Sequence, residues 1–90
     1  MEQQIEKVRK ALIAKFPGAT PELEQAKPLK KVGGFLIWAG FEGMEQIKRQ
    51  RALSRALKEA MTSQDLAHIT TILTITPGEA EAMREAAVAD

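Results

Sequence analysis

The feature that most constrains the fold is a strand, a helix and a second strand that follow one another through the middle of the chain. Residues 32–40 carry apolar side chains at both sets of alternating positions, as expected for a central strand that is covered on both faces. Residues 44–61 show helical spacing, and residues 68–76 alternate and are rich in β-branched side chains. A connection of this length containing a helix favours a parallel pair of strands.

Upstream of this unit, the chain begins with an amphipathic segment. Apolar side chains recur at helical spacing and predict a helix over residues 2–16, through Ile5, Val8, Leu12 and Phe16. Pro17 and Gly18 are expected to end it, because proline disfavours helix in the residue before it and glycine tolerates the turn.

A short edge strand is expected near Glu22–Gln25, where proline and charge are tolerated. The loop 27–31 then leads into the central strand, so this first pair should be antiparallel. Gly33 and Gly34 are adjacent in the central strand and predict a bulge or a close approach of another backbone.

The last third of the chain contains a predicted turn over residues 62–65, the strand over residues 68–76 and a final helix. Alternation in that strand predicts two faces, one carrying Ile69, Thr71, Leu73 and Ile75, the other carrying His68, Thr70, Ile72, Thr74 and Thr76. Thr76 followed by Pro77 and Glu79 has the spacing of a helix N-cap with a capping box.

Together these patterns predict one domain over residues 1–90 of the α+β class. Its expected architecture is a small mixed three-stranded sheet with helices packed on it, in the order α-β-β-α-β-α. The N-terminal pattern is too charged for a signal peptide, and the longest uncharged stretch is too short to span a membrane. The absence of cysteine makes a reducing cytoplasm the simplest expectation.

Catalytic chemistry has few side chains to use in this sequence. There is no cysteine and no tyrosine, and His68 is the one histidine. No serine has a spacing to His68 that supports a nucleophile and base pair, and no phosphate loop or dinucleotide fingerprint is present. We therefore expect a protein that is not an enzyme, and any metal site would need ligands from outside this chain.

Charge is unevenly distributed although the net charge is only +1. The middle of the chain is basic and the segment from Asp65 to Asp90 is acidic. Helical spacing places four cations of segment 44–61 on one exposed stripe, namely Lys48, Arg51, Arg55 and Lys58. Such a stripe can be a solvated face, a nucleic-acid contact or a docking surface for an acidic protein.

Four motifs in this order resemble the BolA family, whose fold is related to one form of the KH nucleic-acid-binding domain. The resemblance runs from about Phe35 to Glu79 and is carried by Phe41-Glu42-Gly43, Arg49-Gln50-Arg51, Ala67-His68-Ile69 and Thr76-Pro77-Gly78-Glu79. Arg49-Gln50-Arg51 is similar to the family's Arg-His-Arg signature, with Gln50 in the middle. His68 aligns with the histidine that opens the third strand.

The resemblance implies an adaptor in iron–sulfur trafficking or redox regulation. Such proteins pair with a monothiol glutaredoxin and share a [2Fe–2S] cluster with it and with glutathione. His68 would donate one ligand, and the loop 27–34 and the basic stripe would help to form the interface. Family members often supply a second ligand from the loop between the first two strands, but residues 26–34 contain neither Cys nor His.

Two other functions stay open at this point. One is a nucleic-acid-binding transcription regulator that contacts DNA phosphates through the basic helix, by Lys48, Arg49, Arg51, Arg55 and Lys58. The other is a BolA-like protein-interaction module that holds no cluster.

Overall fold

The computed structural model describes residues 2–26 and 30–88 of the chain. The elements, in chain order, are α1 (Glu2–Lys15), β1 (Thr20–Ala26), β2 (Lys31–Ile37), the 3-10 turn η1 (Ala39–Phe41), α2 (Gln46–Ala60), α3 (Ser63–Leu66), β3 (Ile69–Ile75) and α4 (Pro77–Val88). The predicted order α-β-β-α-β-α is confirmed, with η1 and the short helix α3 in addition. Three residues of the predicted loop 27–31, residues 27–29, lie outside the described part.

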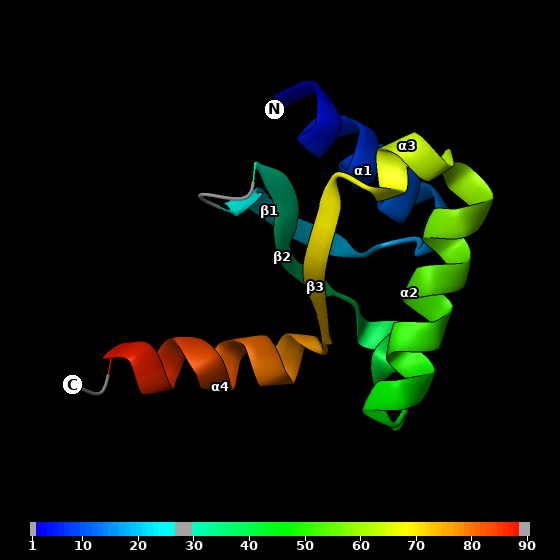
Figure 1. Cartoon of the computed structure of the whole chain (residues 1–90). Coiled ribbons are helices and arrows are strands. Elements are labelled where there is room, and N and C mark those ends of the chain that lie inside the picture. The colour runs from blue at the N-terminus through cyan, green and yellow to red at the C-terminus, as the bar shows by residue number, and fades with distance from the viewer. Residues whose placement is uncertain (1, 27–29, 89–90) are drawn as a thin grey trace.

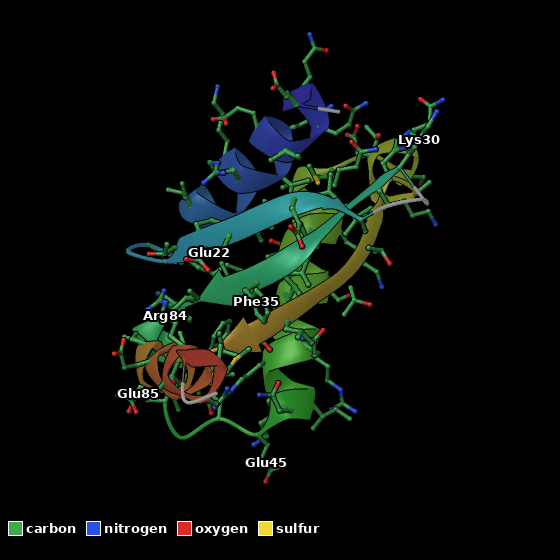
Figure 2. The ribbon with its side chains drawn as sticks, turned by 90° about the vertical axis from the view of Figure 1, so that its left-hand side faces the viewer. Glu22, Lys30, Phe35, Glu45, Arg84 and Glu85 are labelled. Carbon is green, nitrogen blue, oxygen red and sulfur yellow. The ribbon has the colours of Figure 1, made fainter. Side chains whose placement is uncertain are left out.

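The sheet has the strand order β1-β2-β3, so β2 is central and β1 and β3 are edges. β1 pairs with β2 in antiparallel orientation, and β2 pairs with β3 in parallel, which confirms the predicted α+β class with a mixed sheet. Helices α1 and α2 cover one face, as Figure 1 shows. Figure 2 is turned by 90° so that the left-hand side of Figure 1 faces the viewer; Phe35 and Glu22 are labelled on the sheet, and α4 is seen end-on.

The predicted irregularity at the glycine pair is present. Pairing of β2 with β3 shifts between Val32 and Gly34, which stand opposite Ile69 and Ile72 respectively. Gly34 has a φ of +137°, and a Cβ there would collide with the main-chain carbonyl oxygen of Glu22 on β1. Only glycine permits this backbone angle together with so close an approach of the neighbouring strand.

The bulge overturns the two-faced pattern predicted for the third strand. Between the paired positions, β3 advances by one residue more than β2, so Ile69 and Ile72 both pack against the core. From there Ile72 and Thr74 are buried at 3% and 1% exposure, whereas Leu73 is 46% exposed. Strict alternation had placed Ile69 and Ile72 on opposite faces, because a period of two takes no account of an extra residue.

The core lies between the sheet and helices α1 and α2. One end of it is an aromatic cluster in which the ring centroids of Phe16, Trp38 and Phe41 lie 5.1 to 5.7 Å apart. The predicted strand over residues 32–40 ends early, at Ile37, because the chain turns there into η1. Trp38 therefore leaves the sheet, and its Nε1 donates a hydrogen bond to the carbonyl oxygen of Pro17 at 2.9 Å.

Two capping boxes begin the short helix α3 and the last helix α4. Residues 62–65, predicted as a turn, instead lead into α3, since Thr62 and Asp65 exchange side-chain and main-chain hydrogen bonds. Thr76 and Glu79 make the same exchange at the start of α4, as predicted. Helix α4 then runs away from the body (Figure 1). Within the described residues, no helix is both long and apolar enough to cross a membrane.

Candidate functional site

His68 lies on the surface between α3 and β3, and its main chain is held from two sides. Its N–H donates to the carbonyl oxygen of Asp65 at 3.1 Å, and its carbonyl oxygen accepts from the N–H of Val32 at 2.7 Å. The residue as a whole is exposed, and no side-chain hydrogen bond of its imidazole occurs among the described residues. The imidazole is thus presented to solvent on a fixed backbone.

Two charged side chains, Lys7 on α1 and Asp65 on α3, line a small hollow together with His68. Lys7 Nζ donates to Asp65 Oδ1 at 3.0 Å, which ties α1 to the segment that precedes His68. This hydrogen bond, together with the one from the Thr62 N–H, holds the pKa of the Asp65 carboxyl below its usual range. The hollow that Lys7, Asp65 and His68 help to line has a volume of about 10 Å³, which is too small to enclose a ligand.

Acidification is expected to lower the free energy of unfolding, because the Asp65 carboxylate becomes protonated. Because its pKa is lowered by folding, its carboxylate stabilises the native state above the ordinary pKa of an aspartate, and this contribution is lost as pH falls through the folded pKa. Urea midpoints measured from about pH 7 to about pH 2.5 should fall more steeply for the wild type than for Asp65→Asn. Parallel slopes would contradict this role for the carboxylate.

The five cations proposed as nucleic-acid contacts differ in their exposure to solvent. Lys48, Arg51, Arg55 and Lys58 are all exposed on α2, and none is within 4.0 Å of a carboxylate in residues 2–26 and 30–88. Arg49 is different, because only 5% of its surface is exposed. The buried Arg49 side chain is therefore not available to contact a phosphate, and the prediction of Arg49 as a nucleic-acid contact is wrong.

Arg49 instead holds α4 and β3 to the start of α2. Its Nη1 donates to Glu79 Oε1 at 2.7 Å and to the Thr74 carbonyl oxygen at 3.3 Å. Its Nε donates to the Met44 carbonyl oxygen at 2.9 Å, and its guanidinium carbon lies 5.9 Å from the ring centroid of Phe41. The hydrogen bond from Arg49 is the main reason that the pKa of Glu79 is lowered.

Sequence reasoning missed a polar layer between α2 and β3. Gln46 Nε2 donates to the Thr74 carbonyl oxygen at 3.2 Å, and Gln50 Nε2 donates to the Ile72 carbonyl oxygen at 3.1 Å. The buried Thr74 hydroxyl bonds to both glutamines. A signal was present, since Gln46, Arg49, Gln50 and Leu53 share one face of a helix.

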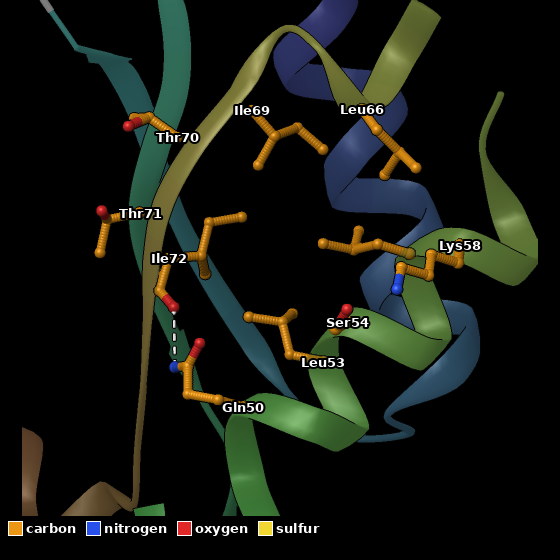
Figure 3. A pocket seen from close by; sticks show the side chains of 10 residues that line it. Gln50, Leu53, Ser54, Lys58, Leu66, Ile69, Thr70, Thr71 and Ile72 are labelled. Atoms are coloured by element: carbon orange, nitrogen blue, oxygen red, sulfur yellow. Dashed lines mark hydrogen bonds between the residues drawn. The ribbon is translucent and has the colours of Figure 1, made fainter. Parts of the chain in front are cut away.

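Beyond this polar layer, α2 and β3 enclose an open groove of about 360 Å³. Figure 3 shows Ile69 and Ile72 projecting into it from β3, with Leu53 and Leu66 opposite. Gln50 closes one end through its bond to the Ile72 carbonyl, drawn as a dashed line. Sequence reasoning did not predict this groove, because its lining residues come from α2, α3 and β3.

The grouping of possible metal ligands can be stated for the described residues. Among the residues that the structure describes, no group of three or more His, Cys, Asp and Glu side chains comes together as a metal site. His68 can supply a single exposed nitrogen ligand to a metal centre whose other ligands come from a partner.

Comparison with known proteins finds similarity to a solved structure. No protein-family model matches the chain, and a search of curated proteins found no match. Among solved structures, BolA1 from Arabidopsis thaliana is similar with a TM-score of 0.63 at 22% sequence identity, over 88% of this chain and 98% of that one. With the mixed sheet and the observed order of elements, this similarity shows that the chain has a BolA-like fold.

Proposed function

We propose that this chain is a cytoplasmic, non-enzymatic adaptor that pairs with a monothiol glutaredoxin and donates His68 to a shared [2Fe–2S] cluster. The observation that carries the proposal is the exposed His68 on a backbone anchored to both Asp65 and Val32. Fixed main-chain bonds lower the entropy lost when the imidazole is placed at a partner's metal centre.

The chemistry of the donor set defines what the partner must provide. Imidazole is a good ligand for iron, and histidine in place of thiolate raises the reduction potential of a cluster. This chain has no cysteine, and its segment 26–34 has no histidine, so the partner and glutathione would supply the remaining ligands. The exposed stripe on α2 would favour an acidic partner and raise its rate of association.

Coexpression with a monothiol glutaredoxin tests the proposal. We expect the purified complex to show the visible absorption and circular dichroism of a [2Fe–2S] cluster, and His68→Ala to change that spectrum. Gln64→Ala, an exposed substitution on α3, is the matched control and should leave the spectrum unchanged. An identical spectrum for His68→Ala would remove His68 from the mechanism, and a complex without cluster would favour an interaction module.

A second candidate function, binding of duplex DNA, has one observation in its favour. Lys48, Arg51, Arg55 and Lys58 form an exposed row on α2, and cations in such a row can replace counterions on phosphates. If they do, Arg51→Ala/Arg55→Ala should make the negative slope of log affinity against log salt shallower by about 2, since each phosphate contact contributes about −0.9 to that slope. Lys10→Ala on α1 is the control, and an unchanged slope in the double variant would exclude this candidate.

A further inference from the structure

The groove between α2 and β3 has the form of a binding site for a short chain segment. Its floor consists of apolar side chains from three elements, namely Leu53, Leu57, Leu66, Ile69 and Ile72. Leu66 and Ile69 are only partly buried, so apolar surface remains accessible in the groove. An apolar side chain of a partner would remove this surface from water, which is the main source of affinity in such sites.

One wall of the groove adjoins the basic stripe on α2, which consists of Lys48, Arg51, Arg55 and Lys58. Ser54 and Lys58 line the groove and also line a shallow hollow on the outer side of α2, together with Arg51, Arg55 and Glu59. Glu59 is already engaged, since it accepts a hydrogen bond from Lys15 Nζ at 2.9 Å. The wall therefore carries excess positive charge, which is complementary to carboxylates that flank an apolar anchor.

The opposite wall limits how a segment can lie. This wall is the edge of β3. Gln50 donates to the Ile72 carbonyl, and Gln46 and Arg49 donate to the Thr74 carbonyl, so α2 side chains cover the C-terminal half of this edge. No α2 side chain bonds the backbone of Thr70 or Thr71 in the described part of the chain. A partner segment would thus enter at the end that Ile69 to Thr71 form.

The residues that line the groove favour a peptide over a nucleic acid as the ligand. Base recognition without a clamp loop relies on stacking against aromatic side chains. The groove is lined by no aromatic residue, and Trp38 packs against Phe16 and Phe41 instead. An aliphatic floor beside lysine and arginine suits an aliphatic side chain with neighbouring carboxylates.

From these observations we infer that the groove between α2 and β3 binds an acidic linear peptide, with an aliphatic anchor residue on Ile69 and Leu66 and with carboxylates at Lys58 and Arg55. This interaction goes beyond the proposed adaptor function, because it requires neither His68 nor a cluster. It gives the chain a second recognition surface, on the edge strand that follows His68.

Synthetic peptides of about ten residues, which reach about 33 Å when extended, test this inference with the isolated chain. The main probe has a central leucine flanked by glutamates. One matched peptide replaces the glutamates with glutamines, another replaces the leucine with serine, and a thymidine oligonucleotide of similar length stands for nucleic acid. We expect the main probe to bind at least about tenfold more tightly than each of the others.

Substitutions in this chain locate the binding. Ser54→Trp fills the groove at an exposed helix position, and Lys58→Glu reverses the charge of its rim. Each should weaken binding at least about fivefold, whereas Lys10→Glu makes the same charge change on exposed α1 and should have little effect. Circular dichroism of every variant verifies that the fold is retained.

Amide chemical shifts complete the test. The main probe should perturb the amides of residues 69–72 and 50–58 above all others. Absence of binding at about 1 mM peptide, equal binding of the uncharged peptide, tighter binding of the oligonucleotide, or full binding to Ser54→Trp would each overturn the inference. His68→Ala should bind the peptide as the wild type does, so failure of the adaptor proposal is distinguishable from failure of this one.

Discussion

Replacing Arg49 with methionine is expected to lower the free energy of unfolding by about 3 kcal/mol, because the change removes the charged donor that several polar groups share. Methionine keeps much of the side-chain volume, so a cavity contributes little. The carbonyl oxygens of Met44 and Thr74 would lose a charged donor in a site where Arg49 is only 5% exposed. Urea unfolding followed by circular dichroism measures the loss.

Arg51→Met is the matched control, since Arg51 lies two residues further along the same helix and is exposed. It should change stability by no more than about 0.5 kcal/mol. In Arg49→Met, amide hydrogens of α4 should also exchange faster, because Glu79 loses the ion pair that ties α4 to α2. Equal stability of the two variants would contradict the anchoring role of Arg49.

Gly34→Ala is expected to cost about 3 kcal/mol or more, which is a large part of the stability of a domain of this size, about 5–10 kcal/mol. Two effects add. An alanine strains the backbone at a φ of +137°, and its Cβ would collide with the Glu22 carbonyl oxygen, so β1 must move away from β2. The free energy of unfolding, or loss of the folded spectrum, reports the effect.

Gly18→Ala separates the two contributions. Gly18 also has a left-handed φ, +84°, but a Cβ there would meet no atom within 4 Å. The cost at Gly18 should therefore be the strain alone, about 1 kcal/mol. If both substitutions cost the same, the close approach of β1 to Gly34 would not be a source of destabilisation.

Most of the fold could be predicted from local patterns. Helical spacing in 2–16 and 44–61, apolar positions on both faces of 32–37 and the capping residues Thr76 and Glu79 each act over a few residues, so the sequence displays them directly. The glycine pair also indicated the bulge. Its effect on the faces of β3 was not predicted, because the place of the extra residue depends on pairing with β2.

The candidate site was less accessible to sequence reasoning. Arginine is seldom buried without a partner, and the partners of Arg49, Thr74 and Glu79, are 25 and 30 residues away in the chain, so a local pattern does not reveal its burial. The groove posed the same difficulty, since its walls come from α2, α3 and β3. Their spacing is set by packing between elements that are distant in the chain.

The sequence by itself determined the order of elements, the mixed sheet, the identity of His68 as the one imidazole and the absence of thiolates, since these follow from residue types and short-range periodicity. Only the tertiary structure decided that His68 is exposed on an anchored backbone, that Arg49 is internal, and that α2 and β3 leave an apolar groove open. Burial and pairing are properties of groups that meet across the fold, and no local pattern specifies which groups will meet.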